Sequence, residues 1–533
     1  MKKFIYSTLL TLFALFSIVG CGGGGGTNEA TKPTITITGE STIIINKGEV
    51  YSDEGATAVD SDGNQLTIIT TGSVDINVAG TYSITYSAVD SNGLSSTKVR
   101  TVQVKDSANP DNPTITITGA TPTTIIKGEA YIDEGATAVD SSGASLTVVT
   151  TTDNVDTSLA GDYSIVYSAT DGQGNSVTAT RVVKVIDTAD CVDLSFVTYS
   201  VDTTLDASCY IANDITIEVN KLLTIAEGTT IFFNSSSALK VKGALKAIGT
   251  PTNPITFTGT TKSAGFWQGI QFYNAVDDRN ELDNTIIDYA GSWNYGALYT
   301  TDSTKLKVSN TLIQNSGVNG FYFSPDTDLV KFTNVTSTNN AEMAGSIGVK
   351  ALPAFDDTSD LTGNNGNDYL EVRISTVTTD QTWNRLTVPV YVDYYIIIDE
   401  NKLVTINAGA TFAFGSSGSL QVKGALKAIG TTENPITFTG STKSVGFWQS
   451  IQFNNAIDSR NEIAFATIEY AGGWGNGNVY LSGSTELNIH DTTIKNGSEN
   501  GISISGCDTT LTNINNTFIG NALVDIYHSS VCN

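Results

Sequence analysis

The sequence contains few of the residues that nucleic-acid binding and histidine-based chemistry require. Only two histidines occur in 533 residues, and 28 basic residues stand against 54 acidic ones, a formal net charge of −26. Nucleic-acid binding needs a cationic surface that displaces counterions, and attraction to anionic lipids needs a basic patch. The charge balance therefore excludes nucleic acid as a partner and favours a well-solvated surface.

A comfortable membrane span is also missing at the start of the chain. Lys2 and Lys3 precede the apolar run Phe4–Val19, which is too short to cross a bilayer easily and is typical of an export signal over residues 1–20. The letters that end it, Ile-Val-Gly-Cys21, resemble the lipobox of bacterial lipoproteins. An ordinary secretory signal with an incidental cysteine is the alternative.

The lipobox resemblance implies that Cys21 is acylated and becomes the mature N-terminus. Gly22 follows it where retention in the inner membrane favours Asp in that family, so the resemblance implies an outer-membrane or cell-surface location. Several acyl chains together anchor a protein firmly. The membrane is therefore an expected partner through the lipid anchor.

Four further cysteines lack the CxxC spacing of a metal site. An even number in an exported chain favours disulfides. Neighbours in sequence pair most economically, which predicts Cys191–Cys209 and Cys507–Cys532 near the two ends of the C-terminal region. Metal ligation is the alternative.

A glycine-rich tether at residues 21–32 precedes a tandem repeat at residues 33–106 and 113–187. In TYSITYSAVD, Tyr82, Ile84 and Tyr86 share one face of a strand, with serine and threonine on the other. Period-two alternation with frequent turn signals predicts a β-sandwich in each repeat. The blocks DEGATAxD and GxYxIxYxAxD resemble the bacterial Ig-like modules found in surface proteins and insecticidal crystal toxins. This resemblance implies a spacer role, because such modules usually act as spacers.

Acidic residues gather in the first repeat, where Asp53, Glu54, Asp60 and Asp62 lie within ten residues. Hard oxygen ligands at such spacing can hold Ca²⁺. The second repeat has DSSGA in place of DSDGN, and no downstream Glu completes a calcium loop. Ca²⁺ is therefore the one cofactor considered, against the alternative of polar turn residues.

Residues 188–533 contain an internal duplication with a constant offset of 181. The stretch VKGALKAIGT occurs at Val241–Thr250 and again at Val422–Thr431. Short alternating strings separated by Gly, Asn, Asp or Ser recur about every twenty residues, without amphipathic helices. Parallel strands joined by short polar turns suit a coil that stacks on itself. The sequence therefore predicts a parallel β-helix of about fifteen coils, roughly 70 Å long.

Three motifs carry a further resemblance: L-x-I-x-x-G-x-x-[IF]-x-F, xGxLxAxGTxxNPITFT and GxWxxI. Each occurs in both copies, except that the first motif opens with Val404 instead of Leu in the second copy. They resemble right-handed β-helices of the pectin-lyase-like superfamily, which spans lyases, hydrolases, adhesins and toxins. We expect lobes at residues 188–348 and 385–533, with a junction or loop at 349–384. In the repeated stretch, Val241, Leu245 and Ile248 should point inward.

One charged block recurs in both lobes and is the best candidate for catalysis. It contains Asp277, Arg279 and Glu281 in the first lobe and Asp458, Arg460 and Glu462 in the second. Two carboxylates could act as acid and base, and an Arg could clamp an acidic sugar. A surface ion pair explains the same residues. His490, whose counterpart is Ser309, is expected to be a solvated strand residue.

Aromatic residues also recur at fixed places. Trp293 and Trp474 occupy glycine-rich turns next to Tyr289 and Tyr470, where exposed rings could stack on sugars; the alternative is that they cap the core. Trp267 and Trp448, in FWQxIQF, have the pattern of buried residues.

These features favour a lipid-anchored surface protein in which Ig-like modules display a β-helix. The working hypothesis is adhesion, or binding of an extracellular polysaccharide or another cell surface, without catalysis. The alternatives are a polysaccharide lyase or glycoside hydrolase, and a purely structural scaffold in an extracellular matrix.

Overall fold

The computed structural model describes residues 32–39, 42–46, 50–60, 62–76, 80–105, 113–292, 295–364 and 367–529. It confirms the predicted all-β architecture of two Ig-like sandwiches followed by a parallel β-helix. The signal segment, Cys21 and the glycine tether lie outside the described residues. Within the described ranges, no helix is both long and apolar enough to span a bilayer.

The first Ig-like domain consists of two sheets, with strand orders β1-β3-β4 and β2-β7-β6-β5. Its strands are β1 (Thr34–Ile37), β2 (Thr42–Asn46), β3 (Ala56–Val59), β4 (Gln65–Leu66), β5 (Ile69–Thr71), β6 (Gly80–Val89) and β7 (Ser95–Lys105). The predicted alternation in β6 is confirmed, because Ile84 and Tyr86 are buried in one core cluster and Tyr82 packs against a second cluster, formed by Ile45, Val102 and Val104.

The second Ig-like domain repeats this arrangement, with strand orders β11-β10-β8 and β12-β13-β14-β9. Its strands are β8 (Thr114–Ile117), β9 (Thr123–Ile126), β10 (Ala136–Val139), β11 (Ser145–Leu146), β12 (Val148–Asp153), β13 (Gly161–Thr170) and β14 (Ser176–Ile186). Apart from its turns 140–144 and 171–175, this domain forms one compact unit with the β-helix, whereas the first domain belongs to another unit.

Each Ig-like core contains one buried arginine that the sequence patterns did not reveal. Arg181 is 1% exposed, and its Nε lies 3.0 Å from Asp133, which also accepts a hydrogen bond from Tyr167 at 2.6 Å. In the first domain Arg100 pairs with Asp53 in the same way. The DEGATA block therefore supplies the carboxylate that neutralises a buried guanidinium.

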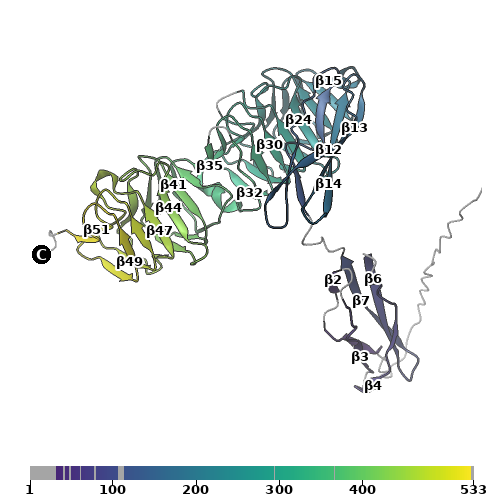
Figure 1. Ribbon diagram of the computed structural model, residues 1–533, viewed down its shortest axis with the longest axis horizontal. Coiled ribbons are helices and arrows are strands. Elements are labelled where there is room, and N and C mark those ends of the chain that lie inside the picture. The colour runs from purple at the N-terminus through teal and green to yellow at the C-terminus, as the bar shows by residue number, and fades with distance from the viewer. Residues whose placement is uncertain are drawn as a thin grey trace, which may run out of the picture. The chain divides into compact units, whose positions relative to one another are not determined.

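The β-helix coils through three faces, and Figure 1 shows its strands stacked one coil upon the next. One continuous sheet has 14 strands, close to the expected number of coils. These strands are β16 (Val197–Tyr199), β19 (Ile215–Ile217), β22 (Ala238–Val241), β25 (Gly269–Tyr273), β28 (Leu298–Thr301), β31 (Phe321–Tyr322), β34 (Met343–Ile347), β35 (Asn367–Val372), β38 (Val390–Val392), β41 (Thr411–Phe414), β44 (Ile436–Gly440), β47 (Ala466–Glu469), β50 (Thr493–Lys495) and β53 (Thr517–Ile519).

The other two faces are each divided between the lobes. In the first lobe one face contains β15 (Val192–Leu194), β18 (Cys209–Ala212), β21 (Thr230–Phe233), β24 (Ile255–Gly259), β27 (Thr285–Asp288), β30 (Leu312–Gln314) and β33 (Thr336–Thr338). The next face contains β17 (Thr203–Leu205), β20 (Leu222–Ile225), β23 (Ala244–Ile248), β26 (Glu281–Asp283), β29 (Lys305–Ser309) and β32 (Asp328–Thr333).

The second lobe completes these faces with two further sheets. One contains β36 (Ser375–Val377), β39 (Tyr395–Ile398), β42 (Ser419–Val422), β45 (Ser450–Asn454), β48 (Val479–Ser482), β51 (Ile502–Ile504) and β54 (Ile526–His528). The other contains β37 (Gln381–Trp383), β40 (Leu403–Ile406), β43 (Ala425–Ile429), β46 (Glu462–Ala464), β49 (Glu486–His490) and β52 (Thr510–Ile514).

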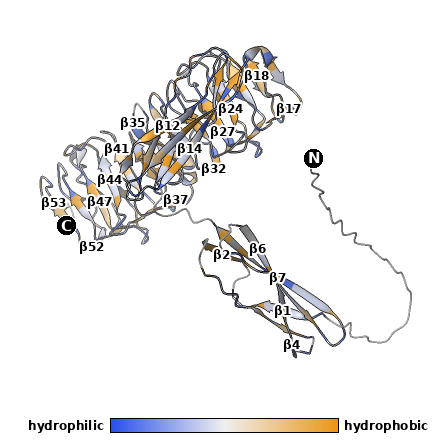
Figure 2. Ribbon diagram, turned by 45° about the vertical axis from the view of Figure 1, so that its right-hand side comes forward, coloured by the Kyte–Doolittle hydropathy of each residue, from blue (hydrophilic) through white to orange (hydrophobic). Residues whose placement is uncertain are grey.

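Aliphatic and aromatic side chains of successive coils stack inside the β-helix, and hydrophobic residues alternate with polar ones along its strands (Figure 2). One internal row runs through parallel register partners Ile215, Leu239, Ile270, Leu298 and Phe321. Such stacking buries apolar surface in every coil and is the main stabilising contribution.

The repeated decapeptide is a coil segment, as expected, but one assignment within it is wrong. Val241 and Leu245 are fully buried, whereas Ile248 is only half-buried and Ala247 points inward instead. Alternation along β23 continues from Leu245 to Ala247, which leaves Ile248 on the outer side of the strand.

The segment 349–384 joins the two lobes without breaking the 14-stranded sheet. The 3₁₀ helix η2 (Val349–Ala354) packs against β32 and β36. It lies where a further strand would continue the sheet that ends with β32. Strands β35, β36 and β37 then begin the second lobe.

The two sequence copies lie on different faces of the coil. Strand β21 belongs to the first face of lobe one, whereas its copy β41 belongs to the 14-stranded sheet. Strand β22 belongs to the 14-stranded sheet, whereas its copy β42 belongs to the sheet of β36. The offset of 181 residues is therefore not a whole number of coils, and the second copy is turned by one face.

A disulfide fastens the N-terminal end of the β-helix. Cys191 follows the short helix η1 (Thr188–Asp190) and is bonded to Cys209 on β18, as predicted. Cys507 is also disulfide-bonded. Its predicted partner Cys532 lies outside the described residues.

Candidate functional site

The predicted charged block forms a loop with an internal ion pair in each lobe. Arg279 Nε lies 2.9 Å from Asp277 Oδ1 and its Nη2 lies 2.6 Å from Oδ2, and Arg460 holds Asp458 with the same distances. This pairing lowers the pKa of both aspartates, with the arginine hydrogen bond as the largest cause. A lowered pKa disfavours either aspartate as a proton donor near neutral pH.

The glutamates of the block lie on strands and meet different neighbours in the two lobes. Glu281 on β26 has Lys246 and Lys307 as its register partners. Glu462 on β46 has Lys427 and Asn488 as its register partners and also lies 3.2 Å from His490, which contacts Asp491 at 2.8 Å. His490 is thus a bridging residue on a strand, and the two carboxylates raise its pKa.

Two of the four candidate calcium ligands have structural roles of their own. Asp53 pairs with buried Arg100, while Asp60 accepts hydrogen bonds from the backbone of Asp62 and Asn64 at 2.9 and 2.8 Å. Asp60 therefore fits the alternative of a turn residue. In the part of the chain that the structure describes, no three acidic, histidine or cysteine residues gather in a way that could hold a metal ion.

The recurrent aromatic residues divide into buried and exposed groups. Trp267 and Trp448 are fully buried and stack on Phe233 and Phe414 at 4.2 Å, so their expected core role is confirmed. Trp474 is 80% exposed and has a left-handed backbone with φ of 69°. A large ring held open to solvent is typical of a contact residue.

The two tyrosines of the predicted glycan site have different surroundings. Tyr470 packs against the β-helix core, and Tyr289 lines a cavity. Trp293 lies outside the described residues. The duplicated YAGxW pattern thus places its tyrosines partly inside the molecule.

The structure reveals a tyrosine cluster on the 14-stranded sheet that the sequence patterns did not single out. We call the tyrosine face the outer surface formed by Tyr273, Tyr295, Tyr299 and Tyr322. Their rings form a connected chain with centroid separations of 4.8 to 6.3 Å. Tyr273 and Tyr295 are 37% and 41% exposed, so the cluster is open to solvent.

Strand register explains why these rings meet. Tyr299 on β28 and Tyr322 on β31 are direct partners in parallel register, and their neighbours Leu298 and Phe321 point into the core. Side chains at such positions on adjacent coils lie about 4.8 Å apart. The sequence signal for this cluster is the occurrence of tyrosine at outward-pointing, alternate positions of strands in successive coils.

Arg373 supports one end of the tyrosine face. Its guanidinium carbon lies 3.8 Å from the centre of the Tyr322 ring, and the guanidinium also donates to the Tyr322 hydroxyl and the Phe323 carbonyl. A stacked guanidinium holds an aromatic ring in a fixed orientation. The tyrosine face is therefore anchored where the two lobes join.

The second copy lacks this surface. At the offset of 181, Asn454, Asn476 and Ser503 occupy the positions of Tyr273, Tyr295 and Tyr322, and only Tyr480 is retained. The same coil geometry accommodates both sets. The tyrosines are thus not required by the fold.

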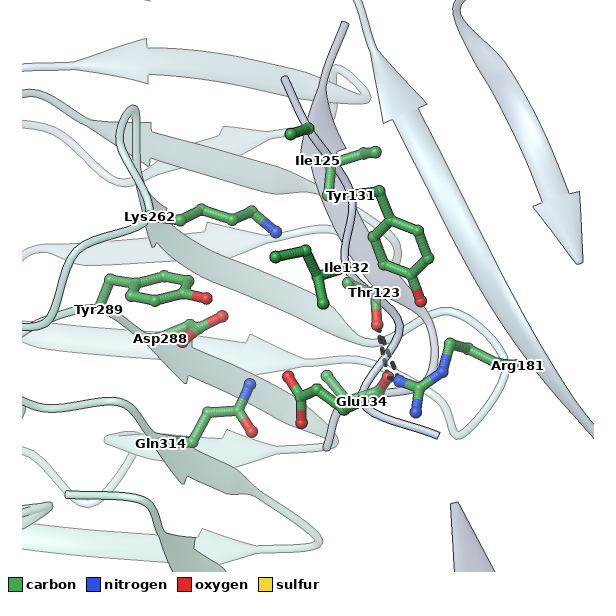
Figure 3. A pocket seen from close by; sticks show the side chains of 12 residues that line it. Thr123, Ile125, Tyr131, Ile132, Glu134, Arg181, Lys262, Asp288, Tyr289 and Gln314 are labelled. Carbon is green, nitrogen blue, oxygen red and sulfur yellow. Dashed lines mark hydrogen bonds between the residues drawn. The ribbon is translucent and has the colours of Figure 1, made fainter. Parts of the chain in front are cut away.

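A second candidate site lies between the second Ig-like domain and the first lobe, inside one compact unit (Figure 3). The cavity has a volume of about 340 Å³. Lys262, Asp288, Tyr289 and Gln314 line it from the β-helix, and Tyr131 and Glu134 from the Ig-like domain. Lys262 Nζ donates to the carbonyl of Thr124 at 2.6 Å.

Burial shifts the titration of both charged groups on the β-helix side of this cavity. Desolvation raises the pKa of Asp288 to about 6, against smaller lowering effects from Asn315, Lys262 and Gln314. Desolvation also lowers the pKa of Lys262. Each neutral form is favoured by removal from water, and the mutual attraction only partly offsets this.

Comparison with known proteins supports the N-terminal part of the architecture. Residues 35–104 and 115–185 each match the family model described as bacterial surface protein, Ig-like domain. No curated protein matches the chain significantly.

Three solved structures show distant similarity. The lipoprotein BT2262 from Bacteroides thetaiotaomicron is 17% identical over 28% of this chain and 98% of its own, with a TM-score of 0.14. A protocadherin gammaB7 cis-dimer structure is 16% identical over 31% and 52%, with a TM-score of 0.14. The M60 catalytic domain with CBM51 domains from Clostridium perfringens ZmpB is 13% identical over 33% and 33%, with a TM-score of 0.14.

TM-scores this low carry no argument about this chain. The family match identifies the type of the two repeats, which are the part of the chain that it covers. The chain therefore contains two Ig-like domains of the bacterial surface-protein type followed by a parallel β-helix, a combination consistent with a surface protein.

Proposed function

We propose that this protein is a lipid-anchored surface protein whose β-helix binds polysaccharide without cleaving it. The observation that carries the proposal is the tyrosine face, four connected rings on the outside of a rigid coil. Exposed aromatic rings offer flat apolar surfaces on which sugar rings can stack, and their hydroxyls can form hydrogen bonds. An extended sheet of parallel coils suits an extended polymer.

The arrangement of charge supports binding over catalysis. In the repeated block the arginines are engaged by their own aspartates, and this pairing lowers the pKa of each aspartate. A glycosidase of the common kind needs two carboxyl groups flanking the bond, one of them with a raised pKa.

The duplicated sequence supplies a matched test of polysaccharide binding. A variant with Tyr273→Asn, Tyr295→Asn and Tyr322→Ser carries the residues of the second copy, so we expect it to fold normally. Loss of stacking at about 1 kcal/mol or more per ring predicts at least a tenfold weaker retention in affinity electrophoresis on the polysaccharide that the wild type binds. Tyr480→Ser is the control on the second lobe and should retain wild-type mobility shifts.

The binding test includes both neutral and acidic polysaccharides. Each polysaccharide is also incubated with the protein and then scored for unsaturated and reducing ends. Equal retention of the triple variant and the wild type on every polymer would remove the tyrosine face as the binding site. Turnover abolished by substitution of Arg279 and Arg460 would replace the binding function with a lyase or hydrolase.

A further inference from the structure

The cavity between the second Ig-like domain and the first lobe contains a buried acceptor without a partner. Gln314 on β30 is 3% exposed, and its Oε1 has no hydrogen-bond partner among the residues that the structure describes. An unsatisfied buried polar group costs about 1–3 kcal/mol. Figure 3 shows the amide at the cavity wall, where a bound molecule with a donor group would satisfy it.

The other polar groups of the wall carry charge of both signs. Lys262 uses one ammonium hydrogen on Thr124 and retains two further donors, whereas Asp288 and Glu134 present acceptors. Arg181 also lines the cavity, but its guanidinium is engaged by Asp133 and by the carbonyls of Ala120 and Gly135. An anionic ligand would lie against two carboxylates, and a cationic ligand would lie against the Lys262 ammonium. Either charge is therefore disfavoured in this partly desolvated site.

Neutral hydroxyl groups match this wall because each hydroxyl both donates and accepts. The rings of Tyr131 and Tyr289 and the side chain of Ile132 add apolar surface. A volume of about 340 Å³ lies at the small end of ligand pockets, which measure about 300–1,000 Å³. We propose that the cavity binds one neutral sugar residue, with Gln314 Oε1 and Lys262 as its polar contacts. This site is separate from the tyrosine face.

In the second copy, the polar groups at the equivalent positions satisfy one another. Lys495 replaces Gln314, and its Nζ lies 3.0 Å from Glu469, the counterpart of Asp288. Glu469 also accepts a hydrogen bond from Thr439 at 2.9 Å. A lysine in place of Gln314 would therefore pair with Asp288 and remove the free acceptor.

Isothermal titration of the full chain with single sugars tests the proposal. The probes are glucose, galactose and mannose as neutral hexoses, glucuronate as the anionic arm and glucosamine as the cationic arm. We expect at least one neutral hexose to bind, and Gln314→Lys to weaken that binding at least tenfold. Lys495→Gln is the matched control and should leave the affinity unchanged.

Lys262→Met provides a second variant, with the melting temperature recorded for each protein, and it should also weaken hexose binding. The triple tyrosine variant should bind the hexose normally, which separates this site from polysaccharide binding. The proposal is overturned if no neutral hexose binds, if glucuronate or glucosamine binds more tightly, or if both cavity variants bind the hexose as the wild type does.

Discussion

Outward-pointing side chains distinguish the two copies even where their core residues are identical. Inside the coil, Val241 and Val422 or Leu245 and Leu426 fill equivalent positions and are fully buried. Outside it, Gln314 and Lys495 stand at equivalent positions but have different partners. Core residues are dictated by packing, so differences that concern binding are expected on the surface.

Asp288 gives a pH-dependent prediction at the residue scale. Its pKa in the folded protein is about 6, above the ordinary aspartate value of 3.8, so the folded state holds this proton more tightly than the unfolded state. The resulting stability is present below pH 4 and is lost as pH rises through 6. A shift of this size corresponds to about 3 kcal/mol.

Asp288→Asn removes this titration. Urea unfolding between pH 4 and 7 should show the variant gaining about 3 kcal/mol relative to the wild type as pH rises. Lys262→Met should shift the pH-dependent loss of folding stability to higher pH, because Lys262 lowers the pKa of Asp288. A constant difference between Asp288→Asn and wild type across this range would contradict the assignment.

At the scale of elements, the buried arginine links the two sheets of each sandwich. Arg181 on β14 reaches Asp133, which lies ahead of β10 in the opposite sheet, and also donates to the carbonyl of Gly135 at 2.9 Å. A buried charge that loses its partner is strongly destabilising.

Asp133→Ala should therefore destabilise the second Ig-like domain by about 3 kcal/mol, with most of the cost due to the uncompensated Arg181. Chemical denaturation followed by tyrosine fluorescence measures it. Asp133→Ala combined with Arg181→Met should recover part of the loss, because the apolar side chain needs no counter-charge. A double variant less stable than Asp133→Ala would show that the pair acts differently.

At the scale of the whole molecule, the one-face rotation between the copies determines what the β-helix can present. Equivalent surfaces of the two lobes lie on different sheets, so the duplication does not produce one long array of identical sites. The 14-stranded sheet instead joins the tyrosine face of lobe one to a different surface of lobe two, which carries Glu469 and Lys495.

Membrane attachment is the whole-molecule property that the lipobox predicts. Cys21→Ser should release the protein from the membrane fraction into the soluble extract, because acylation of that cysteine supplies the anchor. Fractionation with immunoblotting measures the change, and Cys191→Ser is a cysteine control that should stay in the membrane fraction. A Cys21→Ser protein that remains in the membrane fraction would refute lipid anchoring.

The sequence by itself determined the periodic features of this protein. Period-two alternation gave the Ig-like sandwiches, and short polar turns without helices gave the parallel β-helix and its approximate number of coils. Economy of pairing gave Cys191–Cys209, which the structure confirms. These inferences succeed because each depends on spacing along the chain, which local geometry converts directly into strands and turns.

Only the tertiary structure decided which residues meet across coils and domains. The tyrosine face depends on the register of β25, β28 and β31, and the cavity depends on where the second Ig-like domain packs. The rotation between copies depends on how residues 349–384 complete a coil. Contacts between distant segments are set by packing of the whole unit, so no local pattern in the chain encodes them.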